Sequence, residues 1–295
     1  MARFLLALVL WCLWGCTWVS AEGEEEAPLR VTVFDVGHGL AVLLEYDGRY
    51  GLYDSGPDSA GVGDSLRAHG VEELEWVVLS HNHRDHVGGF VDGSLSGKSP
   101  VRIKRLFVGP DTAGGIWRDS VLYVAHKRGI PVDTLVRGDV VQLGPAGGSL
   151  LAEMPDIRVL WPPDYETVDG NHGSVVLQVA WGAGSALLTG DLDSLGEREL
   201  LELSPTLSAD LLQVGHHGSA GSSALAFLAQ VAPEYAVVSV GDGNPYGHPA
   251  ESVVQKLRYV LGDSLRFFRT DRDGSVGFEL WRGLGVIPKD RRDLP

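Results

Sequence analysis

The run from Leu79 to Gly89, Leu-Ser-His-Asn-His-Arg-Asp-His-Val-Gly-Gly, limits the possible folds of this 295-residue chain more than any other stretch. It places three imidazoles and one carboxylate within six positions, directly after the apolar run 76–79. A buried strand that ends there releases the next residues at the edge of a sheet. His81 and His83 can then converge on one divalent ion while Asp85 and His86 turn toward a second. The spacing predicts a dinuclear metal site rather than a merely polar turn.

Further candidate ligands lie where other predicted strands begin or end. Asp191 closes the apolar run 186–190, where a single carboxylate can bridge two metals. His216 and His217 follow the apolar run 211–215, and His172 directly precedes the predicted strand 175–179. Seven of the ten histidines lie at such glycine-flanked junctions, namely His81, His83, His86, His172, His216, His217 and His248. The chain therefore carries enough ligands to enclose two ions.

In their order along the chain, these motifs resemble those of the metallo-β-lactamase superfamily. The narrower resemblance is to the C-terminal metallo-hydrolase domain of the competence DNA-uptake protein ComEC, and it spans about Arg30 to Trp281. The motifs are Asp54-Ser55-Gly56, Ser80 to Gly89, Asn171 to Val179, Leu188 to Asp191, Gly215-His216-His217-Gly218-Ser219 and Tyr246-Gly247-His248-Pro249. The resemblance implies an α/β protein with the αββα four-layer sandwich of the metallo-β-lactamase fold.

Two departures from the ComEC pattern concern the site. The first motif of that branch usually reads Gly-Gln-Gly-Asp, but here it is Gly37-His38-Gly39-Leu40, which removes a carboxylate and adds an imidazole. ComEC-like domains also often have a smaller polar residue in place of His83 or His172. This chain is therefore expected to be better equipped for two metals, with altered substrate contacts near His38.

The resemblance implies a role for each candidate residue. His81, His83 and His172 are assigned to the first metal, Asp85, His86 and His216 to the second, and Asp191 bridges the two. Asp54 is expected to orient a ligating histidine. His217 and His248 remain to contact a phosphate oxygen or to protonate the leaving group. The sequence does not decide whether His216 or His217 binds the metal. His172 has an alternative role in capping the next strand. Zinc suits the imidazole-rich set, and manganese is the alternative.

Two divalent ions about 3.5–4 Å apart can lower the pKa of a shared water and hold it as a bridging hydroxide. The leading hypothesis is therefore an exported phosphodiesterase or nuclease whose partner is a phosphodiester-containing substrate, either nucleic acid or a small molecule. Hydrolysis of a lactone, thioester or β-lactam uses the same metals and is a second hypothesis. A surface binding protein with a structural metal site is the third.

The N-terminal residues predict export. Met1-Ala2-Arg3, the apolar run 4–19 and the ending Val19-Ser20-Ala21 form the pattern of a secretory signal peptide cleaved after Ala21. An uncleaved anchor, or a lipid on Cys16, is the less favoured interpretation. Both cysteines, Cys12 and Cys16, lie within this segment, so the mature domain would be free of thiols, as befits an exported protein.

The net charge of −15 argues against tight, sequence-independent binding to a long nucleic acid, which draws on cations that contact the phosphate backbone. The nearest approaches to a basic patch, residues 102–105 and 289–293, are interpreted as ordinary solvated surface. A nuclease of this charge would act locally, with metal ions attracting the phosphate. No polytopic membrane segment is found, so a role in DNA import does not follow from the resemblance.

The pattern of elements predicts one domain. Strands are expected over 29–35, 41–46, 76–79, 157–161, 175–179, 186–189, 265–269 and 275–281, with helices over 64–69, 116–127, 224–231 and 249–261. A capping box of Ser194 and Glu197 is expected to begin another helix. The expected organisation is a signal peptide over 1–21, an acidic spacer over 22–29, the hydrolase domain over 30–283 and a loose tail over 284–295.

Overall fold

The computed structural model describes residues 27–93, 95, 100–110, 115–144, 154–163, 170–262 and 266–290. The expected signal peptide, with Cys12 and Cys16, lies outside these residues, as does most of the expected acidic spacer. Among the helices within these ranges, none has the length and apolar character needed to cross a lipid bilayer.

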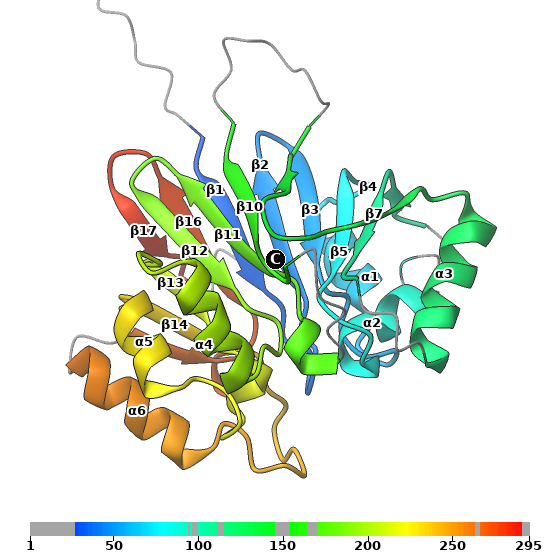
Figure 1. Cartoon of the computed structure of the whole chain (residues 1–295). Helices are drawn as coiled ribbons and strands as arrows, with labels where there is room; N and C mark the ends of the chain where they lie inside the picture. The colour runs from blue at the N-terminus through cyan, green and yellow to red at the C-terminus, as the bar shows by residue number, and fades with distance from the viewer. Residues whose placement is uncertain are drawn as a thin grey trace, which may run out of the picture.

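Two large sheets form the centre of the protein (Figure 1). In the described part of the chain, the first sheet has eight strands, in the spatial order β17 (Gly285–Pro288), β16 (Val276–Trp281), β1 (Leu29–Val33), β2 (Val42–Tyr46), β3 (Arg49–Tyr53), β5 (Trp76–Leu79), β7 (Leu106–Val108) and β8 (Val132–Thr134). The second has seven, in the order β15 (Arg266–Arg269), β14 (Tyr235–Val238), β13 (Leu211–Gln213), β12 (Gly184–Leu188), β11 (Val176–Trp181), β10 (Asp156–Trp161) and β9 (Val140–Val141). A short parallel pair, β4 (Glu73–Leu74) and β6 (Arg102–Ile103), accompanies them.

Each large sheet contains four parallel strands joined by helices. In the first sheet, β3, β5, β7 and β8 are parallel, and the connections contain α1 (Val62–Ala68), α2 (Arg84–Val91) and α3 (Ile116–Arg128). In the second, β12 to β15 are parallel, and the connections contain α4 (Ser194–Leu203), α5 (Leu225–Val231) and α6 (Glu251–Leu261). Parallel strands require such crossovers. Loops at the carboxyl ends of these strands are the places where open α/β sheets bind ligands.

Three buried apolar clusters define four layers. The central cluster joins the facing sides of the two sheets and includes Val31 and Leu177. A second cluster packs the first sheet against its helices through Leu66 of α1 and Phe90 of α2. The third packs the second sheet against α4, α5 and α6 and includes Leu200. The αββα sandwich expected from the motifs is therefore confirmed.

Local turn chemistry explains where several elements begin and end. Asp47 and Gly48 have φ values of 49° and 68°, as a two-residue type I′ turn between β2 and β3 requires. Gly129 ends α3 in the left-handed conformation, with a φ of 64°. The expected capping box of α4 is wrong, because Asp193, not Ser194, is the N-cap and accepts a hydrogen bond from the Gly196 amide.

The C-terminal boundary also differs from expectation. Residues 285–288, assigned to a loose tail, form strand β17, which pairs antiparallel with β16. This pairing is a tertiary contact that a local pattern of four residues does not reveal. The short helix α7 (Thr270–Asp273) lies between β15 and β16.

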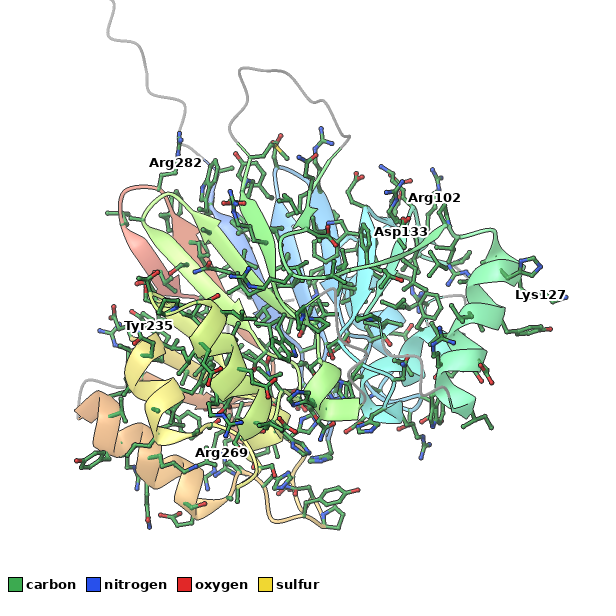
Figure 2. All side chains as sticks on the ribbon, in the orientation of Figure 1. Arg102, Lys127, Asp133, Tyr235, Arg269 and Arg282 are labelled. Atoms are coloured by element: carbon green, nitrogen blue, oxygen red, sulfur yellow. The ribbon has the colours of Figure 1, made fainter. Side chains whose placement is uncertain are left out.

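Cationic side chains are dispersed over the surface, as Figure 2 shows for Arg102, Lys127 and Arg282. The basic stretch at 102–105 is largely neutralised by acids. Arg102 lies 2.9 Å from Glu73, and the Lys104 ammonium lies 2.8 Å from both Glu73 and Glu75. These pairs agree with its interpretation as ordinary solvated surface.

Candidate metal centre

The candidate ligands are carried to one place by the carboxyl ends of parallel strands from both sheets. Asp54 follows β3, His81 and His83 follow β5, Asp191 follows β12, and His217 follows β13 in the short helix η3 (His216–Gly218). Asp85 and His86 lie in the first turn of α2, which begins at Arg84 within the segment expected to be a loop. The helix holds these two side chains at adjacent positions on one rigid element.

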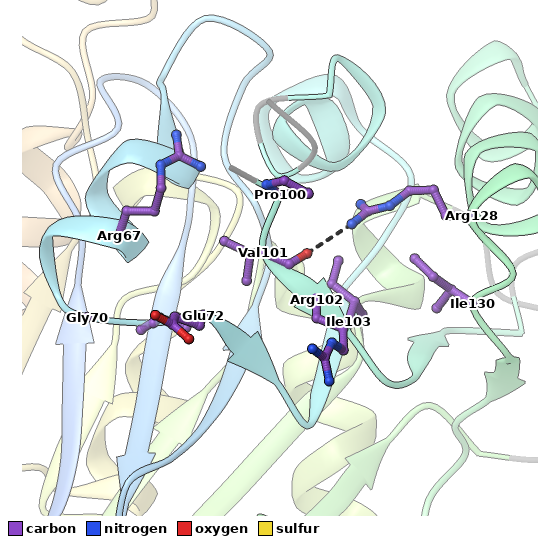
Figure 3. Close-up of a pocket in the computed structure, with 10 residues that line it drawn as sticks. Arg67, Gly70, Glu72, Pro100, Val101, Arg102, Ile103, Arg128 and Ile130 are labelled. Carbon is purple, nitrogen blue, oxygen red and sulfur yellow. Dashed lines mark hydrogen bonds between the residues drawn. The ribbon is translucent and has the colours of Figure 1, made fainter. Parts of the chain in front are cut away.

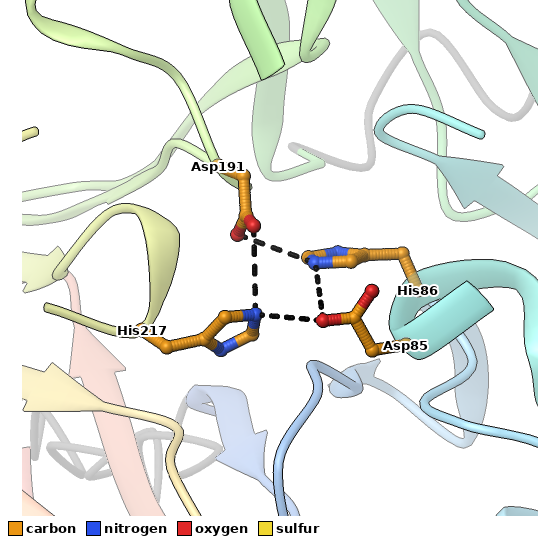
Figure 4. A group of neighbouring side chains, drawn as sticks. All are labelled: Asp85, His86, Asp191 and His217. Atoms are coloured by element: carbon orange, nitrogen blue, oxygen red, sulfur yellow. Dashed lines mark ion pairs between the residues drawn. The ribbon is translucent and has the colours of Figure 1, made fainter. Parts of the chain in front are cut away.

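Four of these residues form a compact cluster, Asp85, His86, Asp191 and His217 (Figure 4). Each offers one ligand atom, and these atoms all lie within 4.8 Å of one another. Nε2 of His86 lies 3.2 Å from Asp191, and Nε2 of His217 lies 3.3 Å from Asp85 and 3.5 Å from Asp191. Asp191, His86 and His217 are buried, and Asp85 is partly exposed. Two carboxylates and two imidazoles at this spacing match the donor set of a divalent metal site.

Three atoms at the centre of the cluster support this interpretation. Nε2 of His86, Oδ1 of Asp191 and Nε2 of His217 are buried and form no hydrogen bond within the described residues. Buried polar atoms without hydrogen bonds are rare and costly in folded proteins. Because all three face one another in the cluster, the residues fit a bound cation that would satisfy them together.

The charges within the cluster reinforce one another. Burial alone would raise the pKa of Asp191, but His217 and His86 hold it well below its usual value. Burial alone would lower the pKa of His86 and His217, but the nearby carboxylates raise both. The carboxylates therefore stay ionised and attract positive charge.

Both central imidazoles, those of His86 and His217, are oriented by contacts at Nδ1. Nδ1 of His86 lies 2.7 Å from the fully buried Asp54 carboxylate, and Nδ1 of His217 lies 2.9 Å from the Ser239 carbonyl. Each contact turns Nε2 of the ring toward the cluster, as is typical of ligating histidines. Asp54 thus occupies the orienting position that the sequence analysis assigned to it.

The backbone at the ligands is unusual. Asp54, His216 and His217 have φ values of 60°, 51° and 53°, in the left-handed region that residues other than glycine seldom adopt. Two such residues in succession are strained and persist only where the surroundings hold them. With this backbone conformation the His217 ring is buried and lies in the cluster.

His81 and His83 lie beside the cluster rather than within it. Nε2 of buried His81 is 2.9 Å from Nδ1 of His83, and the rings of His81 and His86 are 4.2 Å apart between centroids. Burial and the neighbouring His86 hold the pKa of His81 well below its usual value, so the ring is neutral and available as a ligand. His81 and His83 therefore lie beside the four-residue cluster, where they can contribute to the first metal to which they were assigned.

The structure corrects the placement of His172. Its Nδ1 lies 2.9 Å from Asp193 and its Nε2 lies 3.4 Å from Glu199, so both ring nitrogens face carboxylates of the α4 region. The preceding residue, Asn171, instead lines the cavity beside the cluster and contacts His216 at 3.2 Å. Asn171 was not singled out from the sequence, although it begins one of the motifs that carried the resemblance.

His216 and His217, between which the sequence left the choice of metal ligand open, differ in position. His217 is in the cluster, whereas Nε2 of His216 lies 3.9 Å from Asp191 and lines the cavity above it. His248 lines the same cavity, 6.1 Å from His216 between ring centroids. His216 therefore takes the place beside His248 that had been assigned to His217.

The cluster opens into a cavity of about 380 Å³. Its wall contains residues of both halves of the fold, namely His38, His83, Arg84, Asp85, Trp117, Asn171, Asp191, His216, His217, Tyr246 and His248. The additional imidazole at His38 was expected near the substrate, whereas Arg84 and Trp117 were not singled out from the sequence. Arg84 is held by Asp58, with contacts of 2.6–3.0 Å.

A larger cavity of about 810 Å³ lies apart from the cluster, between residues 67–72 and 100–130 (Figure 3). Two of its three arginines are already paired, Arg67 with Asp64 and Arg102 with Glu73. The third, Arg128, donates a hydrogen bond to the Val101 carbonyl. This cavity contains none of the candidate ligands, so its size does not make it the reactive site.

The sandwich and the cluster of carboxylates and imidazoles between its sheets together define a metal-dependent hydrolase. The chain belongs to the metallo-beta-lactamase superfamily, whose family model matches residues 34–242. The metallo-beta-lactamase fold protein YhfI of Bacillus subtilis has the same fold, with a TM-score of 0.55 and 15% sequence identity over 85% of this chain and 99% of that protein.

One relative is named as a competence protein and another as a product of the ComE operon. Competence protein ComA of Neisseria gonorrhoeae is 35% identical over 89% of this chain and 34% of its own length. ComE operon protein 3 of Bacillus subtilis is 32% identical over 78% of this chain and 28% of its own length. The resemblance to ComEC-like proteins is thus confirmed, and the chain spans about a third or less of the length of these relatives.

Proposed function

We propose that this protein is a metal-dependent phosphodiesterase that cleaves nucleic acid or nucleotide esters. The observation that carries the proposal is the combination of a metal cluster with several hydrogen-bond donors in one cavity. The imidazoles of His38, His216 and His248 and the guanidinium of Arg84 line the cavity that contains Asp191. Such donors match the oxygens of a phosphodiester, which carries negative charge before and during reaction.

The residues that would hold the metals are those of the cluster and its flank. Asp85, His86, Asp191 and His217 would surround one ion, and His81 and His83 would contribute to a second, with Asp191 placed to face both. Zinc suits the imidazoles, and manganese suits the carboxylates. Bound divalent ions supply an activated water and neutralise charge on the scissile group.

The remaining residues would bind and orient the substrate. Burial lowers the pKa of His216 and of His248, so both are neutral at pH 7 and can donate a ring N–H to a phosphate oxygen. Arg84, whose Nε and Nη2 already donate to Asp58, would offer its Nη1 to the substrate at the mouth. Asn171 would hold His216 in place through its side-chain amide.

The relative named as a competence protein favours a nucleic-acid or nucleotide substrate over a lactam. The test is hydrolysis of bis(p-nitrophenyl) phosphate compared with a chromogenic cephalosporin, each with added zinc or manganese. We expect metal-dependent cleavage of the phosphodiester, reduced at least 100-fold in Asp191→Asn. Cleavage of the lactam or of a lactone, with none of the phosphodiester, would overturn the proposal in favour of the second hypothesis. If the protein binds metal but cleaves neither the phosphodiester, the lactam nor the lactone, a binding role is favoured.

We further propose that the enzyme acts after export, because residues 1–21 have the pattern of a cleavable signal peptide. Expression in a bacterial host followed by fractionation and N-terminal sequencing tests this. The expected product is an exported protein that begins at Glu22. A product that retains Met1 in the cytoplasm would contradict it.

A further inference from the structure

The mouth of the metal cavity carries aromatic rings that the hydrolytic chemistry does not require. Tyr246 and Trp117 line the same cavity from different parts of the chain. Tyr246 belongs to the loop after β14 and is 67% exposed, which is unusual for a large ring in contact with a buried site. Trp117 lies in the first turn of α3, and the Arg84 guanidinium is 6.0 Å from the centre of its ring.

One face of the Tyr246 ring is covered and the other is open. The rings of His38 and His248 stack against it at 4.9 Å and 5.6 Å between centroids, each inclined by 25°. The two imidazoles are 5.8 Å apart, so both lie on the same side of the phenol ring. The solvent-exposed part of Tyr246 is therefore the opposite face of its ring, and this face can stack on a planar group.

The loop that carries Tyr246 is held in place before any substrate arrives. The Asn244 side chain donates to the carbonyls of Gly241 and His248 and accepts from the His248 amide, at 2.8–3.0 Å. Gly241 packs against the backbone of Gly37 and His38, where an added Cβ would lie 2.7 Å from the His38 nitrogen. Because the loop is already fixed, stacking on the Tyr246 ring costs little conformational entropy.

Tyr246 also borders two neighbouring hollows that a chain-like substrate can occupy. It lines the cavity above the cluster and a neighbouring cavity of about 440 Å³, and both contain His38, Arg84 and Asp85. The first hollow also contains Asp191 and His217, whereas the second is lined by Pro57 and Ser59 instead. A substrate that reacts in the first can therefore extend beside Tyr246 into the second.

We propose that Tyr246 is a specificity-determining residue that stacks on the nucleobase next to the scissile phosphodiester, so that the preferred substrate is an unpaired nucleotide strand. This inference rests on the proposed phosphodiesterase function and assigns a base-binding position to it. A base within a duplex is already stacked on its neighbours and cannot present a face to Tyr246, whereas stacking on an aromatic side chain accepts any unpaired base. The net charge of −15 also disfavours tight binding of a long duplex, which draws on cations that contact the phosphate backbone.

The test uses two chromogenic esters that share one leaving group. One is the p-nitrophenyl ester of thymidine 5′-phosphate, and the other is the same sugar-phosphate ester without the base. Both are offered to the metal-loaded wild-type protein and to the variants Tyr246→Ala and Tyr246→Phe. Tyr259→Ala, which removes another highly exposed tyrosine on α6, is the matched control.

Tyr246→Ala is expected to raise KM for the thymidine ester by roughly 5-fold to 100-fold, while kcat changes little and the ester without a base is unaffected. Tyr246→Phe, which keeps the ring, should restore the wild-type KM, and bound metal should be equal in all variants. An equal loss on both esters, or no loss on either, would overturn the assignment of Tyr246 while the phosphodiesterase function stands. A wild-type protein that cleaves neither ester, nor bis(p-nitrophenyl) phosphate, would overturn the proposed function itself.

Discussion

The carboxylate of Asp54 accepts a hydrogen bond from Nδ1 of His86 at 2.7 Å, and this contact aims Nε2 of the same ring at Asp191. Asp54 is held in turn by the amide and hydroxyl of Ser80, at 2.6 Å and 2.7 Å. The tautomer and direction of one ligating ring are thus set by a residue that never reaches the cavity.

Asp54→Asn should weaken metal binding without unfolding the site. Asparagine tolerates the left-handed φ of 60° at this position, but its amide group would face Nδ1 and favour the wrong tautomer of His86. We expect metal affinity to fall roughly 10-fold to 100-fold, measured by calorimetric titration with manganese or zinc. Asp64→Asn, on the exposed side of α1, is the control, and equal affinities in both variants would contradict the orienting role.

Alanine at His217 and at His216 should have different effects on bound metal. Nε2 of His217 lies 3.3 Å and 3.5 Å from the two carboxylates of the cluster, whereas that of His216 lies 3.9 Å from Asp191. His217→Ala should therefore lose at least one equivalent of metal per chain, and His216→Ala should retain it while losing activity. Elemental analysis of both proteins decides the point, and the reverse result would restore the order expected from the sequence.

Removal of metal should lower thermal stability. A ligand present at about 100 times its Kd stabilises the folded state by roughly 2.7 kcal/mol, which corresponds to roughly 5–10 °C for a domain of this size. We expect EDTA to lower Tm by about this amount and added manganese or zinc to restore it. In Asp191→Asn, the Tm measured with EDTA and the Tm measured with added metal should nearly coincide. If metal still raised the Tm of that variant, the metal would bind elsewhere.

Glu197 should make stability fall as pH rises toward neutrality. Burial raises the pKa of this carboxyl from 4.5 to about 7, although it accepts hydrogen bonds from the Ala224 and Ser223 amides. Between these values the folded protein keeps a proton that the unfolded chain has lost, so the free energy of unfolding decreases with pH. Relative to Glu197→Gln, the wild type should lose roughly 2–3 kcal/mol between pH 5 and pH 8 in urea unfolding.

Exposed Glu202, on the same helix, supplies the control for this comparison. The unfolding free energy of Glu202→Gln should follow that of the wild type across the same pH range. Parallel curves for the wild type and Glu197→Gln would refute the assigned role of Glu197.

Gly88→Ala should displace the helix that carries two ligands. A Cβ at this position of α2 would lie 2.3 Å from the Asp58 nitrogen and 2.8 Å from the Pro57 carbonyl carbon, both rigid backbone atoms. We expect a loss of roughly 1–3 kcal/mol in unfolding free energy together with weaker metal binding. Gly221→Ala, where the nearest atom would lie 3.7 Å from the new Cβ, should change neither quantity. Equal stability of the two variants would show that α2 can shift to accommodate the methyl group without cost.

The sequence was most informative where a ligand directly follows an apolar strand. Asp85, His86 and Asp191 were predicted to share a site because β5 and β12 end immediately before their segments, and the ends of parallel strands bring such residues to one edge. The sandwich followed from the same motifs through their resemblance to a known family.

The sequence was least informative where tertiary contacts choose between equivalent neighbours. His216 and His217 follow the same strand, and their order depends on two successive left-handed backbone conformations that no local pattern predicts. His172 has the same glycine-flanked setting as the other histidines, but carboxylates from the distant α4 region, including Glu199, hold its ring.

The antiparallel pairing of β1 with β16, in which Val31 lies opposite Phe278, has a consequence for protein synthesis. About 250 residues separate the two partners, and at roughly 5–20 residues per second the ribosome needs about 12 to 50 s to translate them. Throughout that interval the edge of β1 that pairs with β16 stays open, and the unpaired backbone groups of an open edge invite pairing with other chains. The β1 strand therefore needs protection from such pairing until β16 has been synthesised.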